Sequence, residues 1–169
     1  MKKLIVSLAC ALCAATGLRA QNYAFINSES VFKSLDDYNA AIEQLDNLAA
    51  QYRKNVDEAY ADLDEMYNNY QAQKAYLSET NRNRREDEIV TREREINKYQ
   101  QDVLGPEGDL MKKRVELIKP IQDRVFAVID KYAKDNGLGM IIDRTNNQTL
   151  LYYAPELDKT EEIINLLKQ

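Results

Sequence analysis

The sequence contains a stretch of 87 residues, 18–104, without a single glycine or proline. Glycine and proline are the residues at which helices most often break or end. Without them, this stretch is expected to form unusually long helices. This stretch is about half of the 169 residues. The remaining residues are too few to form a large enzyme pocket as well. Its long helices indicate an arm or a spacer.

Most of this stretch carries a heptad pattern. Two sets of positions, each spaced by seven residues, are almost entirely apolar: Ile42, Ala49, Val56, Leu63, Tyr70 and Leu77, and Tyr38, Leu45, Tyr52, Ala59, Met66 and Gln73. Only one of these positions is polar, which predicts a coiled coil. A helix over residues 38–78 would be roughly 60 Å long at 1.5 Å per residue.

The heptad pattern fades over residues 78–83 and then resumes at Ile89, Ile96, Tyr99 and Val103. Asn83 and Glu86 have the spacing of a capping box, which predicts a new helix there. If the chain reverses near residue 82, Leu77 faces Ile89 and Leu63 faces Val103. We therefore expect an antiparallel helical hairpin with its tip near residues 79–85. A single continuous helix also fits the pattern.

The predicted arm covers residues 36–134. Ser34, Asp36 and Asp37 are the candidate N-caps of its first helix. The sequence Gly105-Pro106-Glu107-Gly108 interrupts the returning half at 105–108, because a proline at least kinks a helix. Gly137 is suited to the left-handed position that ends helices.

The two ends of the chain have a different pattern, typical of short strands. Strands are predicted at residues 23–26, 138–143 and 149–153, followed by a final helix capped by Asp158 and Glu161. The predicted fold class is α+β, mainly helical, with a coiled-coil hairpin on a small β-rich body formed by residues 21–35 and 135–169. Three strands and one helix form a small core, so we expect the body to be completed by oligomerisation.

Residues 1–20 have the pattern of a cleavable signal peptide. A basic start is followed by about 15 apolar residues, too few for a membrane span, and by Ala20 before Gln21. We therefore expect an exported protein that begins near Gln21. A lipoprotein signal anchored at Cys10 is the alternative.

The mature composition excludes several functions. Both cysteines lie within residues 1–20 and the chain has no histidine, so catalytic triads, thiol nucleophiles and the usual zinc sites are absent. We expect no enzyme activity, cofactor or metal site. Removal of residues 1–20 leaves 20 basic residues against 28 acidic ones, a balance that argues against nucleic-acid binding.

The mature chain, residues 21–169, resembles the Skp/OmpH family of periplasmic chaperones. The resemblance depends on the order of its parts: a signal peptide, the aromatic segment 23–32 and a long charged hairpin. Its most specific segments are 120–129, 137–143, 150–155 and 158–160.

The resemblance implies a homotrimer in which three helical arms project from a small β-body and enclose a cavity. Unfolded outer-membrane β-barrel proteins are held in that cavity without ATP. This chain departs from the family's better-known basic members, because residues 36–65 carry nine acidic residues and only Arg53 and Lys54 as basic ones. Membrane-surface binding is therefore not carried over.

The candidate client-contact residues are two tyrosines a heptad apart and three arginines at the expected tip: Tyr60, Tyr67, Arg82, Arg84 and Arg85. The tyrosines could instead widen the coiled-coil seam. Met66 and Met111 could be adaptable client contacts, but we expect them to fill gaps in the seam. The oligomerisation candidates are Phe25, Ile26, Ile141, Ile142, Leu150 and Leu151. The alternative function is a periplasmic adaptor or spacer that binds one folded envelope partner.

Overall fold

The computed structural model describes residues 22–147 and 149–169, so the predicted signal peptide lies outside the described residues. The chain forms two compact units. We call residues 35–124 the arm, and residues 22–34 with 125–169 the body. The predicted arm extended to residue 134, but the helix contributes to the body from the fully buried Val125 onward.

The body contains a two-stranded sheet. Strand β1 (Tyr23–Ile26) pairs in parallel with β2 (Met140–Asp143), with Tyr23 opposite Met140 and Ile26 opposite Asp143. Parallel neighbours need a crossover connection, and here the connection includes all of residues 35–124. The predicted first strand is confirmed, and the second is two residues shorter than expected.

Two short helices pack together in the body: α2 (Ser28–Lys33) and α6 (Thr160–Leu167). The Asn27 side chain accepts a 2.9 Å hydrogen bond from the Ser30 amide and so caps α2. The predicted apolar face of α6 is buried at Ile163 and Ile164. The core of the body is formed by Ala24, Phe25, Ile26, Val31, Val125, Ile163 and Ile164.

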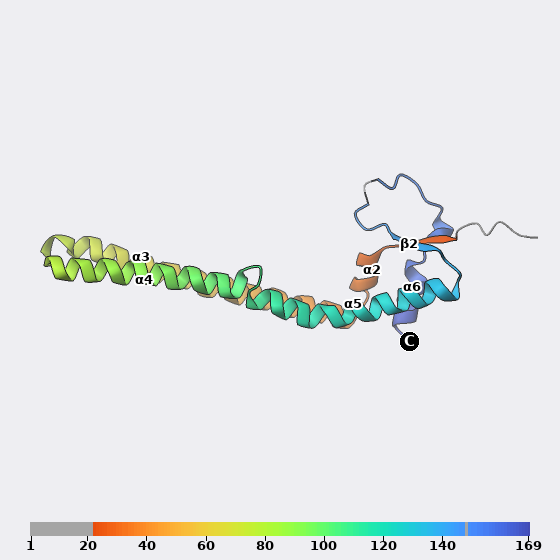
Figure 1. Cartoon of the computed structure of the whole chain (residues 1–169), viewed down its shortest axis with the longest axis horizontal. Helices are drawn as coiled ribbons and strands as arrows, with labels where there is room; N and C mark the ends of the chain where they lie inside the picture. The colour runs from red at the N-terminus through yellow and green to blue at the C-terminus, as the bar shows by residue number, and fades with distance from the viewer. Residues whose placement is uncertain (1–21, 148) are drawn as a thin grey trace, which may run out of the picture. The chain divides into compact units, whose positions relative to one another are not determined.

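The predicted third strand at 149–153 does not form. After β2, residues 144–147 and 149–154 have no regular secondary structure (Figure 1), and a short 3-10 helix, η2 (Pro155–Leu157), follows them. The backbone near the next helix occupies the second side of β1, because Asp158 bridges to Phe25 and the Lys159 amide donates to the Phe25 carbonyl. This leaves Leu151 93% exposed.

The predicted capping box of α6 is also wrong. The N-cap residue is Lys159, without a side-chain cap. The Asp158 carboxylate instead accepts hydrogen bonds from the backbone and hydroxyl of Thr160.

The arm contains helices α3 (Asp36–Gln73) and α4 (Glu79–Leu104), which run side by side (Figure 1), and the first part of α5 (Asp109–Asp135). The hairpin prediction is confirmed. Helix α3 begins after Leu35, so none of the three predicted N-caps is used. Asp36 and Asp37 lie in the first turn, where carboxylates favour the helix dipole.

The heptad positions form the seam of the arm. Leu45, Ala49, Val56 and Tyr70 are buried on α3, and Ile96 and Val103 are buried on α4. Gln73, the one polar member of the pattern, is exposed. In a coiled-coil seam, the buried residues recur at alternating spacings of three and four residues.

The reversal lies earlier than predicted. A 3-10 helix, η1 (Lys74–Tyr76), ends α3, and Ser78 then caps α4 through a 3.4 Å bond from the Asn81 amide. Asn83 and Glu86 therefore lie inside α4. The register shifts accordingly: Tyr60 bonds to Asn97 and Tyr70 to Glu86, instead of the expected pairing of Leu63 with Val103.

The predicted interruption at 105–108 separates α4 from α5. Helix α5 ends in a Schellman motif: the Leu138 amide donates to the Ala133 carbonyl, and the Gly137 amide to the Lys134 carbonyl. Gly137 has the positive φ of 62° that this motif needs. Among the helices of the described residues, none combines the length and hydropathy that a membrane span requires.

Candidate functional site

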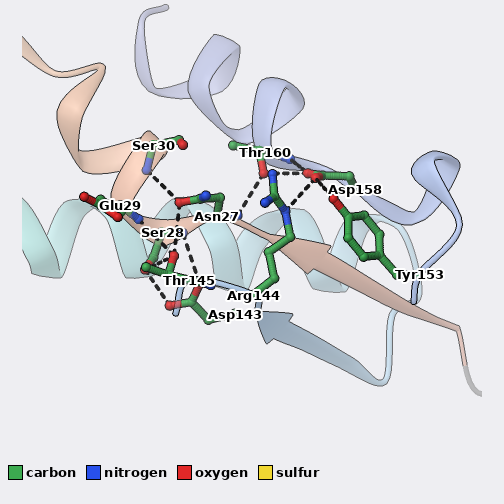
Figure 2. A network of polar contacts seen from close by, with 10 residues as sticks. All are labelled: Asn27, Ser28, Glu29, Ser30, Asp143, Arg144, Thr145, Tyr153, Asp158 and Thr160. Atoms are coloured by element: carbon green, nitrogen blue, oxygen red, sulfur yellow. Dashed lines mark hydrogen bonds and ion pairs between the residues drawn. The ribbon is translucent and has the colours of Figure 1, made fainter. Parts of the chain in front are cut away.

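A polar network joins the two ends of the chain in the body (Figure 2). Asn27 follows β1, and Asp143 ends β2. Parallel strands place their carboxyl ends at the same edge, so these side chains come together. The Ser28 hydroxyl and amide donate to Asp143, and the Thr145 hydroxyl donates to Asn27 at 3.0 Å.

The second half of the network is centred on Asp158. The Arg144 guanidinium donates to this carboxylate at 2.8 Å and lies over the Tyr153 ring, 5.5 Å from its centroid. Thr160 donates to Asp158 through both its amide and its hydroxyl. Figure 2 shows Arg144, Tyr153 and Thr160 converging on this one carboxylate.

Both carboxylates are held in the ionised form. Partial burial raises the pKa of Asp143, but hydrogen bonds from Ser28 and Thr145 outweigh this effect and leave the pKa below its usual value. Burial likewise raises the pKa of Asp158, and bonds from Thr160 and Arg144 bring it below the usual value. Carboxylates whose oxygens are held by hydrogen bonds in this way stabilise the body. They are poorly suited to proton transfer.

A second cluster lies near the hairpin tip. The hydroxyl of the buried Tyr70 donates to Glu86, and Lys74 lies 3.6 Å from Glu86 and 5.3 Å from the Tyr70 ring centroid. This hydrogen bond raises the pKa of Tyr70 and lowers that of Glu86. The cluster ties the end of α3 to the beginning of α4.

The two candidate tyrosines differ in their surroundings. Tyr60 is half-buried, and its hydroxyl donates to Asn97 across the hairpin at 3.0 Å. Tyr67, one heptad further along α3, is 50% exposed. Tyr60 therefore widens the seam, while Tyr67 presents its ring to solvent.

The three candidate arginines lie in the first turns of α4. Arg82 is half-buried, and its Nε is buried without a hydrogen-bond partner among the described residues. Arg84 and Arg85 are exposed and both lie near Glu88, at 4.0 and 3.6 Å. Their charge is thus partly balanced locally.

The oligomerisation candidates fall into two groups. Phe25 and Ile26 are buried in the body of a single chain, and the Phe25 ring contacts Tyr23 and Tyr153. Ile141, Ile142 and Leu150 are half-buried. Leu151 is almost fully exposed, and so is its neighbour Tyr152, at 81%.

Sequence reasoning missed two features. The first is Tyr152 beside Leu151 on the loop after β2. The second is an apolar cavity of about 250 Å³ next to the interruption between α4 and α5. Arg53 and Arg114 flank this cavity. The glycine-proline interruption of the heptad pattern is the signal that could have located this cavity, because it removes a section of one side of the seam.

No metal site emerges from this geometry. Within residues 22–147 and 149–169, no group of three or more acidic, cysteine or histidine side chains is arranged to hold a metal ion. The acidic residues of α3, such as Asp57 and Asp62, are exposed on the helix surface.

The sequence matches a family model, and the fold matches that of a solved structure. The OmpH family model, described as outer membrane protein (OmpH-like), matches residues 22–167. A crystal structure described as an OmpH-like outer membrane chaperone from Caulobacter crescentus CB15 has a TM-score of 0.68 to this chain. The match covers 89% of this chain and 86% of that one at 12% identity, so it concerns the fold alone. No curated protein sequence matches the chain.

Proposed function

Because the chain belongs to the OmpH-like outer membrane protein family, we propose that it is a periplasmic chaperone that binds unfolded outer-membrane β-barrel proteins. The observation that carries this proposal is the hairpin arm, whose α3 alone has 38 residues. A helix of this length extends about 57 Å at 1.5 Å per residue. Such an arm offers a long surface to an extended client.

The surface of the arm suits weak and distributed binding. Exposed apolar or aromatic side chains are distributed along it, at Tyr67, Tyr76, Val90, Met111 and Val115. Charged residues surround them, and many form (i, i+3) or (i, i+4) ion pairs such as Lys98–Asp102. Exposed pairs of this kind contribute little to stability but keep the surface hydrated. The arm can therefore contact apolar client segments and remain soluble.

The proposed assembly is a homotrimer whose arms enclose the client. The body supports oligomerisation because β2 pairs only with β1 among the described strands, which leaves an open edge. Unpaired strand edges and exposed apolar side chains are common features of association surfaces. Leu151 and Tyr152 supply such side chains. In this mechanism enclosure prevents aggregation, and binding and release need no catalytic residue and no nucleotide.

The acidic balance of the chain restricts its partners. With 28 acidic residues against 23 basic ones in the full sequence, the protein lacks the concentrated positive charge that nucleic acids attract. Binding to anionic membrane surfaces is not part of the proposal for the same electrostatic reason.

The test is a dilution assay. A urea-unfolded outer-membrane barrel protein is diluted into buffer with and without residues 21–169, and aggregation is followed by light scattering. We expect suppression of scattering near one trimer per client. As a control, a soluble protein that is not a barrel is unfolded by urea and diluted in the same way, which measures the selectivity for barrels.

Undiminished aggregation with a folded and oligomeric protein would contradict the chaperone function. That outcome would favour the alternative of an adaptor that binds one folded envelope partner. An adaptor and a holdase differ in selectivity, because a holdase binds several unfolded barrels and an adaptor recognises one native surface.

A further inference from the structure

An apolar cavity of about 250 Å³ lies in the arm beside the helix break. We call it the break pocket. Its apolar lining comes from Ile42, Leu45, Ala49, Leu104, Leu110 and Met111. Ile42, Leu45 and Ala49 come from α3, where Leu45 and Ala49 are buried in the seam. Leu104, Leu110 and Met111 flank the break.

The break explains why a cavity occurs here. Helix α4 ends at Leu104 and α5 begins at Asp109. Residues 105–108 therefore place no regular helix opposite this part of α3. Gly105 lines the space and has no side chain to fill it. A gap of this kind leaves the apolar atoms that line it without packing partners, and a bound apolar group would supply them.

Two arginines lie at the rim of the break pocket. Arg53 from α3 and Arg114 from α5 line it together with one acidic residue, Asp46. Within residues 22–147 and 149–169, neither the Arg53 nor the Arg114 guanidinium forms an ion pair or hydrogen bond. Arg53 is one of only two basic residues in the acidic segment 36–65.

Exposed apolar side chains continue from the pocket along α5. Met111 is 45% exposed and Val115, one turn later on the same side, is 53% exposed. Met111 does not fill a gap as the sequence suggested. An exposed, flexible thioether is instead adaptable to different bound groups.

We propose that the break pocket binds a large apolar side chain of an unfolded polypeptide whose neighbouring residue is acidic. The apolar group occupies the cavity, Met111 and Val115 cover it, and Arg53 and Arg114 bind the adjacent carboxylate. The proposal rests on the chaperone function proposed above, and it adds a preference for acidic, apolar client segments.

The size and charge of the pocket favour this occupant. A cavity of about 150 Å³ lined by aliphatic side chains is sufficient for a benzene ring, so 250 Å³ accommodates one aromatic or large aliphatic side chain. It lies below the range of about 300–1,000 Å³ usual for small-molecule sites. Two arginines against one aspartate give the rim net positive charge, which suits a carboxylate.

Binding of labelled short peptides, followed by fluorescence anisotropy, tests the preference directly. We expect a peptide of alternating phenylalanine and aspartate to bind the full mature protein more tightly than peptides in which lysine replaces aspartate or serine replaces phenylalanine. Equal binding of the aspartate and lysine peptides would overturn the role of the arginines.

Variants at exposed positions test the location. Arg53→Glu with Arg114→Glu should weaken binding of the phenylalanine-aspartate peptide about fivefold, as expected for two exposed ion pairs. The matched control is Lys54→Glu with Arg94→Glu, which makes the same change in net charge at exposed positions outside the pocket. An equal loss in both variants would show a general charge effect and contradict the proposed site.

The apolar part of the site is tested in the same way. Met111→Ser with Val115→Ser should reduce peptide binding, whereas Val90→Ser, at a residue 41% exposed elsewhere on the arm, should not. Circular dichroism verifies that all variants remain folded. Unchanged binding in the Met111 and Val115 variant would place the peptide elsewhere.

Photo-crosslinking identifies the occupant. A benzoylphenylalanine at position 115 should crosslink to the unfolded client, and the same probe at position 90 should do so less. Crosslinking only between copies of this chain would mean that a second copy covers the pocket, which contradicts the proposal. Failure of wild-type protein to suppress aggregation would reject the chaperone function separately, because peptide binding is measured without any client.

Discussion

The hydroxyl oxygen of Thr160 accepts a 2.8 Å hydrogen bond from the backbone nitrogen of Asn27, although 133 residues separate the two in the chain. Thr160 is buried and is the first residue of α6, and Asn27 caps α2. This bond therefore connects the N-terminal and C-terminal segments of the body at the point where their helices begin.

Replacement of Thr160 by valine should destabilise the body. Valine keeps the shape of threonine but leaves the Asn27 amide without its acceptor, and an unsatisfied buried donor costs about 1–3 kcal/mol. We expect a loss of this size in the free energy of unfolding, measured by urea denaturation. Thr160→Ser keeps the hydroxyl and should lose less. Equal losses in the two variants would assign the effect to packing.

The body should lose stability in acid. The folded-state pKa values of Asp143 and Asp158 lie below their usual values, so their ionised forms stabilise the folded state above the unfolded pKa of about 3.9. This contribution disappears as the pH falls through the folded pKa. The free energy of unfolding should therefore decline below about pH 4, as urea denaturation at several pH values would measure.

Asp143→Asn separates this effect from a general acid response. The variant should be less stable than wild type at pH 7 and should show a smaller decline between pH 7 and pH 3. Asp123→Asn, which removes an exposed carboxylate paired with Lys119 in the arm, is the control. The same decline in Asp143→Asn as in wild type would mean that this carboxylate does not contribute.

The cluster at the hairpin tip should control local opening. Tyr70→Phe removes the hydroxyl that bonds to Glu86 and keeps the buried ring. We expect severalfold faster amide hydrogen exchange around η1 and the start of α4, with little change elsewhere. Tyr76→Phe, at a residue 90% exposed, should leave exchange unchanged. Unaltered protection of the tip in Tyr70→Phe would show that seam packing alone holds it.

The sequence predicted the family, the hairpin and the break correctly, because each leaves a direct trace. A seam repeats every seven residues, and Gly105-Pro106 interrupts it at one point. The tip was misplaced because a 3-10 turn over Lys74–Tyr76 reverses the chain without glycine or proline. Ser78 then begins α4 with a cap whose bonded partner is Asn81, a pattern weaker than the apparent box at Asn83 and Glu86.

The body was harder to predict because its contacts join distant segments. Residues 149–153 have the composition of a strand but find no strand partner within the described chain, since Lys159 bonds to β1. The polar network could have been foreseen in part. Asn27 and Asp143 each stand at the end of a strand, and a parallel pairing brings those ends together.

Gly108 should resist substitution. A Cβ at this buried position would lie 2.9 Å from the Asp102 carbonyl oxygen and 3.0 Å from the Gly105 nitrogen, and backbone atoms cannot move aside easily. We expect Gly108→Ala to destabilise the arm by about 1–3 kcal/mol in urea denaturation. At Gly139 the nearest atom to a Cβ would be the Asn22 oxygen at 3.7 Å, so Gly139→Ala should have little effect. Equal stability of the two variants would mean that the break rearranges freely.

Leu151 and Tyr152 should matter for assembly and not for the fold of one chain. They are 93% and 81% exposed, so Leu151→Ser with Tyr152→Ser removes few contacts within the chain. If these side chains are buried between copies, each contributes about 1.5–3 kcal/mol, and their loss should weaken association at least about tenfold. Analytical ultracentrifugation over a range of concentrations measures this change, with Tyr76→Ser at the tip as the control. An unchanged sedimentation profile with an intact circular dichroism spectrum would place the oligomer interface elsewhere on the body.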